Sequence, residues 1–196
     1  GDNLTLMGTT ALKMARVEAG LLLMDVDFHS ARHAWVDAQR ETPTELGWGW
    51  MLRGLEKSDR AFEGRASIER ELARGSSRWT TLGLAVDVHD YERVHDAAGI
   101  LAPRHEVYAE TTMSLYRRND TPWDHAGYAT SFHYSSLLRR PLAIAKVPMD
   151  LAVNGAEVDL ELTVIRRPHN VLARVQRAAF FNPARKTSSA EEDQGA

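Results

Sequence analysis

The chain has 196 residues, 24 basic and 27 acidic side chains, a formal net charge of -3 and a hydrophobic content of 43%. These values are ordinary for a globular protein that can bury a core. Because the basic residues are mixed with acidic ones, neither nucleic acid nor a membrane surface is an expected partner. The lack of cysteine excludes a disulfide framework, a thiolate zinc site, an iron–sulfur cluster and a cysteine nucleophile in this chain.

The sequence also gives no sign of membrane insertion. No apolar run approaches the roughly 18 residues that would suggest a membrane span. The first residues lack the basic region and apolar core of a secretory signal peptide. We therefore expect a cytoplasmic protein.

Residues 11–23 are predicted to form an apolar helix. Its polar residues Lys13 and Arg16, together with Gly20, fall on one narrow stripe at helical spacing. Apolar side chains surround that stripe, so most of the helix is expected to be buried. Residues 24–28 then alternate apolar and acidic side chains, which is the period of a strand, and predict a switch from helix to strand.

The next stretch contains a polar segment compatible with a helix, then one predicted strand and one predicted helix. Residues 29–41 are polar and compatible with a helix that ends before Pro43, because the residue preceding proline avoids the helical region. Residues 45–55 are aromatic and contain glycines, which favours a strand and a turn. Residues 65–73 carry apolar side chains at helical spacing and are followed by Gly75, which predicts a helix.

The pattern changes near residue 78, after which strands dominate. Residues 78–88 are rich in β-branched side chains, and Asp90 is then expected to cap a short helix that runs to about residue 98. Turn-prone segments separate five further predicted strands, at residues 111–116, 125–134, 142–147, 157–165 and 171–181. Several short strands with regular turns favour a β-barrel or a sandwich.

We therefore expect an α+β N-terminal segment followed by an all-β barrel. The expected units are residues 1–78, the barrel at residues 79–187, and a disordered tail at residues 188–196 that has almost no apolar content.

Glu18 is the most unusual residue of the first predicted helix, because its neighbours at helical spacing are apolar. A buried carboxylate must be paired, hydrogen-bonded or protonated. One interpretation is a structural carboxylate that holds a loop or an arginine. The other is a contact to a substrate or cofactor.

Three further patterns have a chemical and a structural interpretation. Asp25 and Asp27 would share one face of a strand, as an acid–base or cation-binding pair or as exposed acids. His29 and His33 have zinc-ligand spacing, but no third ligand is evident, so no metal site is expected. In a strand, Trp48 and Trp50 would form one aromatic wall, suited to stacking a planar ring or to core packing. No phosphate loop, nucleophile elbow or local triad signature is present.

Six segments spread over residues 8–186 form an ordered set: "GTTALKMARVEAGLLLMDVDF", "TPTELGWGWML", "FEGRASIERE", "TLGLAVD", "AGYATSFHYSSLLRRPLAIAKV" and "RVQRAAFFNPARK". In this order they resemble the C-terminal half of the glycine cleavage T-protein (aminomethyltransferase) superfamily. The family versions contain G-x-x-A-R-D-x-L-R-L-E-A-G, P-x-E-x-G-L-G-W and F-x-G-R-x-A-L.

The resemblance implies a tetrahydrofolate-dependent one-carbon enzyme of three domains around a central channel. Its relatives include the T-protein, folate-dependent demethylases and parts of sarcosine and dimethylglycine dehydrogenases. In the T-protein the catalytic aspartate and most of the pterin pocket lie in the N-terminal half. The chain is therefore expected to be the C-terminal portion, with no catalytic residue of its own, inactive alone and partnered by the N-terminal catalytic half.

The resemblance also assigns residues. The family arginine that contacts folate falls on Leu12, whereas a second arginine and the glutamate fall on Arg16 and Glu18. The family tryptophan falls on Trp50, and a C-terminal tyrosine that approaches folate falls near Arg185. Arg16, Glu18, Trp50 and Arg185 are therefore the expected cofactor-binding residues.

Departures from the family pattern indicate a paralogue of the T-protein with another methyl or aminomethyl donor. Besides Leu12, Phe132 replaces a family glycine. The main hypothesis is a tetrahydrofolate-dependent aminomethyl or methyl transferase, or demethylase, in which this chain closes the folate channel over a small donor. The alternative is a non-catalytic barrel module for assembly or ligand binding that has lost folate affinity.

Overall fold

A computed structural model of the chain describes residues 6–105, 107–119, 121 and 123–183. The helices are α1 (Thr9–Ala19), α2 (Arg65–Arg74) and α3 (Val88–Ala97), with short 3-10 turns η1 (Asp37–Gln39), η2 (Gly49–Leu52) and η3 (Leu55–Lys57). The strands are β1 (Trp79–Val86), β2 (Tyr108–Ala109), β3 (Met113–Arg117), β4 (His125–Ser135), β5 (Arg140–Pro148), β6 (Glu157–Val164) and β7 (Arg167–Gln176).

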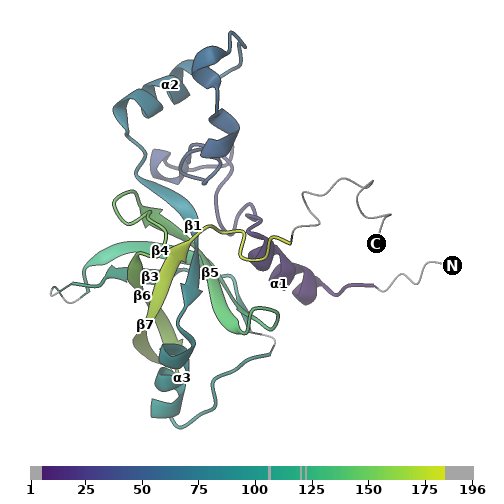
Figure 1. The fold of residues 1–196 in the computed structure, drawn as a ribbon, viewed down its shortest axis with the longest axis vertical. Coiled ribbons are helices and arrows are strands. Elements are labelled where there is room, and N and C mark those ends of the chain that lie inside the picture. The colour runs from purple at the N-terminus through teal and green to yellow at the C-terminus, as the bar shows by residue number, and fades with distance from the viewer. Residues whose placement is uncertain (1–5, 106, 120, 122, 184–196) are drawn as a thin grey trace.

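Six strands close into an antiparallel barrel, as predicted. Their order is β4-β3-β6-β7-β1-β5, and β5 pairs back onto β4, so the sheet has no free outer strand. The short β2 pairs with the later part of β4. Figure 1 shows the barrel at the centre, α3 at its lower end, α1 beside it, and residues 42–75 with α2 at the upper end.

The alternation of side chains along the strands builds the core. In β6, Val158, Leu160, Leu162 and Val164 face inward while the intervening residues are partly or fully exposed. Val158 lies opposite Ala173 of β7, which is also buried. Because period-two patterning fixes which face of a strand is buried, the inward face of β6 follows directly from the sequence.

Two local details of the barrel differ from the sequence predictions. Ile165 and Arg166 both have positive φ and form the two-residue hairpin between β6 and β7, so the strand begins at Arg167 rather than after the predicted longer turn. The side chain of Asp87, not Asp90, accepts the capping hydrogen bond of α3, donated by the backbone N–H of Asp90.

Helix α1 is shorter and more exposed than predicted. It ends at Gly20, whose φ of 70° permits a Schellman cap in which the N–H of Leu21 donates to the carbonyl of Arg16 at 2.8 Å. Only Arg16 and Val17 are buried, and Val17 packs on Leu142 of β5. The prediction of a mostly buried helix was wrong because α1 rests on the barrel along one narrow face.

The predicted strands between α1 and α2 are also wrong. Residues 24–28 form one isolated bridge, between Met24 and Phe28. Residues 45–55 form turns and η2, because Gly47 and Gly54 adopt positive φ and reverse the chain. The predicted helix at residues 65–73 is confirmed as α2.

Two ion pairs hold the loop before η2 against the barrel. Arg78 Nε donates to Glu45 Oε1 at 2.7 Å, and Lys146 of β5 pairs with Glu41. The Lys146 ammonium also lies over the rings of Trp79 and Tyr128. These contacts fix the loop, and with it the tryptophans that follow.

Helices long and apolar enough to cross a membrane are absent from the described part of the chain. The division near residue 78 stays a prediction, although β1 does begin at Trp79. The predicted tail at residues 188–196 lies outside the described residues.

Candidate functional site

Arg16 lies in a buried polar network, not in an open site. Its Nη1 donates to Asp27 Oδ2 at 2.6 Å, and the two side chains are 9% and 0% exposed. Its Nη2 donates to Tyr108 and Ser131, each at 2.8 Å. In the described chain only Nε of this guanidinium lacks a partner, and that atom is buried. From this position Arg16 cannot reach a ligand.

Asp27 is the centre of the same network. Its Oδ1 accepts hydrogen bonds from Thr130 at 2.6 Å and Ser131 at 2.7 Å, and its Oδ2 accepts the backbone N–H of Leu23 at 2.8 Å. The carboxylate therefore ties the chain after α1 to strand β4. Its neighbour Asp25 has positive φ and an exposed side chain, so the predicted same-face acid pair does not exist.

Tyr108 links the network to the surface. Burial, and then its hydrogen bond to Glu110, raise the pKa of Tyr108 to about 12. The Tyr108 hydroxyl, followed by the Lys13 ammonium, lowers the pKa of Glu110. The phenol therefore stays neutral and donates to Glu110 while accepting from Arg16. The cluster therefore joins α1 and the loop after it to strands β2 and β4.

Glu18 has the contacts expected of a structural carboxylate. Its Oε1 accepts a hydrogen bond from Ser135 Oγ at 2.6 Å and lies 3.4 Å from Nε2 of the buried His133. The side chain is 18% exposed. Because serine and histidine both contact the carboxylate and not each other, these residues do not have the geometry of a triad.

No potential metal centre occurs among the described residues, in which no three histidine, aspartate or glutamate side chains come together. His29 lies 3.9 Å from Asp25. His33 is exposed.

The most promising open site is a hollow of about 600 Å³ beside Trp50, which we call the Trp50 hollow. The end of α1 at Gly20, the loop that carries Trp50, the start of β1 at Thr80 and the segment around Arg177 surround it. Its volume lies within the roughly 300–1,000 Å³ of small-molecule sites. Trp50 is 61% exposed, so its ring is available to a ligand.

Two glycines allow the walls of this hollow to pack closely. A Cβ on Gly20 would lie 2.5 Å from the backbone carbon of Ala178, and one on Gly47 would lie 2.5 Å from the carbonyl oxygen of Thr81. Both glycines have positive φ. The geometry of the hollow therefore depends on glycine at positions 20 and 47.

Among the described residues, the charged side chains that line the hollow are those of Arg53 and Arg177, and none is acidic. Both side chains are exposed, and within the described residues neither forms an ion pair or a side-chain hydrogen bond. An aromatic wall flanked by two unpaired guanidinium groups suits a planar ligand that carries negative charge.

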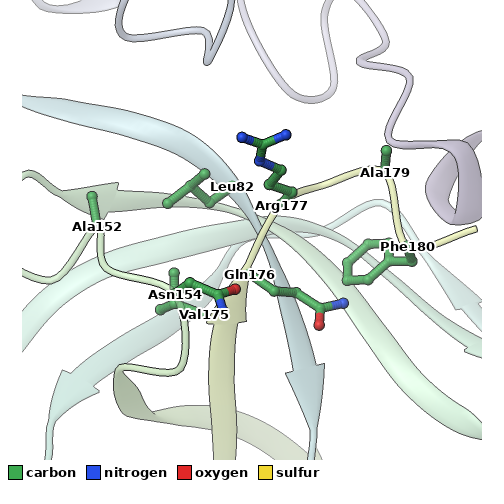
Figure 2. A pocket seen from close by; sticks show the side chains of 8 residues that line it. All are labelled: Leu82, Ala152, Asn154, Val175, Gln176, Arg177, Ala179 and Phe180. Atoms are coloured by element: carbon green, nitrogen blue, oxygen red, sulfur yellow. The ribbon is translucent and has the colours of Figure 1, made fainter. Parts of the chain in front are cut away.

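Arg177 also borders a second hollow, of about 570 Å³. Figure 2 shows Arg177 projecting away from Gln176 and Phe180, from the segment that follows β7. The side chains of Leu82 and Ala179 are shared by both hollows. Arg177 therefore stands between two adjoining spaces at one end of the barrel.

The structure separates the residues that the sequence grouped together. Trp50 opens onto a hollow, whereas Arg16 and Glu18 are engaged by barrel side chains. Trp48 does not share a strand face with Trp50, but it also lines the Trp50 hollow and meets Phe28 edge to face, with ring centroids 5.7 Å apart. Arg185 lies outside the described residues.

Arg53 and Arg177 were not identified from the sequence. Arg177 had been assigned to a strand interior, but β7 ends one residue earlier. A break in the apolar alternation after Val175 is the signal that could have indicated its exposure.

Comparisons with known proteins place these features in a family. No protein-family model matches the chain. The aminomethyltransferase of Synechococcus sp. (strain WH7803) is 30% identical over 178 residues, which cover 85% of this chain and 38% of the relative. The aminomethyltransferase of Synechococcus sp. (strain RCC307) is 28% identical over 177 residues, covering 88% and 39%. The chain thus spans less than two fifths of the length of these relatives.

A solved structure agrees with the fold. The glycine cleavage system aminomethyltransferase T from Bartonella henselae superposes with a TM-score of 0.61 and 20% identity, over 87% of this chain and 38% of that chain. At that identity the likeness concerns the fold. With the sequence relatives, it shows that the chain is similar, in sequence and in fold, to the C-terminal, barrel-containing part of the glycine cleavage T-protein (aminomethyltransferase) superfamily.

Proposed function

We propose that the chain is the C-terminal portion of a tetrahydrofolate-dependent one-carbon transferase, and that the Trp50 hollow is its contribution to the folate site. The observation that carries the proposal is the composition of that hollow within the described part of the chain: an exposed indole, two arginines without an ion pair, and no acid. The relatives' name, aminomethyltransferase, gives the reaction class.

The hollow suits tetrahydrofolate in shape and charge. Its volume of about 600 Å³ is sufficient for much of a folate, whose planar ring would stack on Trp50. The carboxylates of the folate tail would pair with Arg53 or Arg177. When bound, tetrahydrofolate would supply the nitrogen that accepts the one-carbon unit, a methyl group or, from an aminomethyl donor that releases ammonia, a methylene group. The residues of this chain bind and orient it and keep water away.

The N-terminal catalytic half is the proposed partner. Apart from Trp50, eleven of the nineteen large apolar side chains that are exposed in the described chain lie between residues 6 and 72. Exposed apolar surface gathered on one part of a protein is typical of an interaction site. In this proposal those side chains pack against the half that holds the catalytic aspartate, and the chain alone is inactive.

One observation favours the alternative, a non-catalytic module that has lost folate affinity. Leu12, at the position where the family resemblance predicts a folate-binding arginine, is 60% exposed and lies eight residues, about 12 Å of helix, before Gly20. Arg16 and Glu18 are held by the barrel. The same departures support a paralogue whose donor, such as an amine, a sulfonium or an aryl ether, differs from that of the T-protein. A cytoplasmic location stays a prediction.

A turnover assay tests the proposal. The chain is assayed alone and joined to the preceding catalytic half, with tetrahydrofolate and each of the three donor classes. We expect one-carbon transfer by the joined protein and none by the isolated chain. Turnover by the isolated chain would refute the proposal that the catalytic residues lie in the N-terminal half. A joined protein that neither turns over nor binds folate would favour the non-catalytic module.

A further inference from the structure

Figure 1 shows α3 at the lower end of the barrel. Tyr91 and His95 of this helix line a further pocket, which does not depend on the proposed folate site. We call it the α3 pocket. Its volume is about 440 Å³, within the range of small-molecule sites.

The pocket exists because two neighbouring strands separate. Strands β3 and β6 pair from Leu115 opposite Leu160 to Arg117 opposite Val158. Beyond that point, in the described part of the chain, residues 161–164 of β6 pair only with β7. Residues 111–113 form the opposite wall of the gap. The barrel wall is therefore open at this place.

Aromatic rings form the inner wall. Tyr91 of α3 and Phe132 of β4 both line the pocket, with ring centroids 6.3 Å apart and planes inclined by 37°. The Tyr91 hydroxyl donates to the carbonyl of Pro103 at 2.9 Å. Burial and then the nearby Tyr134 raise the pKa of Tyr91 to about 12, so this wall is neutral. Such walls favour a planar, largely apolar ring.

His95 contributes a hydrogen-bond acceptor. The residue is 6% exposed, lines the pocket, and has Nδ1 2.8 Å from the carbonyl oxygen of Tyr91. Since a carbonyl can only accept, Nδ1 is the donor, and in the neutral ring Nε2 is an acceptor. Within the described residues Nε2 has no hydrogen-bond partner. A ligand N–H would satisfy it.

Glu161 provides the charge. It is the only charged residue among those that line the pocket in the described chain. Its Oε2 accepts the hydroxyl of Tyr116 at 2.8 Å, which leaves Oε1 available. The pocket thus combines neutral aromatic walls, a histidine acceptor and one carboxylate.

We propose that the α3 pocket binds a small planar ring compound that carries an N–H group and a cationic amine. The ring fills the pocket in front of the largely buried Tyr91 and Phe132, a ring N–H donates to His95 Nε2, and the amine pairs with Glu161. Anionic compounds of the same shape are excluded because the pocket offers no cation to compensate them.

Tryptamine, indole-3-acetamide and indole-3-acetate form a matched series of probes. They share the indole ring, and the first is cationic, the second neutral and the third anionic. Each is titrated into the complete chain, and backbone amide shifts are followed by NMR. We expect saturable shifts at Thr111, Thr112 and Thr163 with tryptamine, and binding of indole-3-acetate at least tenfold weaker. Equal affinity for the acetate, or no saturation by tryptamine up to millimolar concentration, would overturn the proposal.

Variants test the carboxylate. Glu161→Gln is expected to weaken tryptamine binding at least fivefold, while Glu157→Gln, on the same face of β6, leaves it unchanged. Methylation of the indole nitrogen tests His95 without altering the protein and is expected to weaken binding. Equal tryptamine affinities of the Glu161→Gln and Glu157→Gln variants would contradict the role of Glu161. Thermal unfolding of both variants checks that each is folded.

Discussion

Arg16 of α1 and Asp27 form a buried ion pair, with Nη1 and Oδ2 2.6 Å apart. Ser131 and Thr130 of β4 donate to the same carboxylate. The pair therefore joins the helix, the loop that follows it and the barrel wall. It positions the end of α1, and hence one wall of the Trp50 hollow.

Replacing Arg16 with methionine is expected to destabilise the chain by about 3–5 kcal/mol, because Asp27 would remain buried without its counter-charge. Urea unfolding of the variant and of wild type measures the difference in the free energy of unfolding. Lys13→Met is the control, since Lys13 pairs with Glu110 at the surface and its loss should cost less than about 1 kcal/mol.

The double variant Arg16→Met with Asp27→Asn should recover part of that loss, because the uncompensated charge is removed. Equal stability of Arg16→Met and wild type would show that the pair does not hold α1 in place.

Gly20→Ala is expected to destabilise the chain by at least about 2 kcal/mol. The new methyl would be strained at positive φ and would lie 2.5 Å from the backbone of Ala178. Gly54 also has positive φ, but a Cβ there would meet no atom within 4 Å. Gly54→Ala should therefore show only the conformational cost, roughly 1 kcal/mol.

Thermal unfolding of the two alanine variants compares these effects. If Gly54→Ala loses as much stability as Gly20→Ala, then α1 is not packed against the segment after β7.

The stability of the chain should fall in acid partly through Glu45. Burial raises the pKa of Glu45, but the hydrogen bonds from Arg78 and from the backbone of Thr42 outweigh it and leave the pKa below 4.5. Because the folded pKa is the lower one, this stabilisation is complete above about pH 4.5 and is lost as the pH falls through the folded pKa.

Urea midpoints measured between pH 3 and pH 7 test this. Glu45→Gln should lower stability at pH 7 and flatten the acid slope, whereas Glu56→Gln, at an exposed position, should follow wild type. An unchanged slope in Glu45→Gln would contradict the assignment.

The barrel was predictable because its strands carry a local signal. In β6 the alternation of Val158, Leu160 and Leu162 alone fixes the inward face. The segments before β1 lack that signal, and their conformation depends on distant contacts. Glu45 is held by Arg78, and Asp27 by Thr130, 103 residues away in sequence.

The site was predictable only in part for the same reason. Trp50 is exposed because the chain turns at Gly47 and Gly54. The aromatic composition of this segment predicted a strand instead of these turns. Arg16 was assigned to a polar stripe, but its partners come from β2 and β4 and bury it. Helical spacing shows which residues share a face, not what covers that face.

Titration of tetrahydrofolate into the protein that joins this chain to its catalytic half, followed by calorimetry, tests the central claim most directly. We expect micromolar binding that Trp50→Ala weakens about tenfold, equivalent to roughly 1.4 kcal/mol of lost stacking. Arg177→Gln should reduce the salt dependence of binding. Trp123→Ala, at an exposed tryptophan outside both the hollow and the proposed interface, should bind like wild type. Identical affinities for the Trp50 and Trp123 variants, or no binding by wild type, would contradict the account.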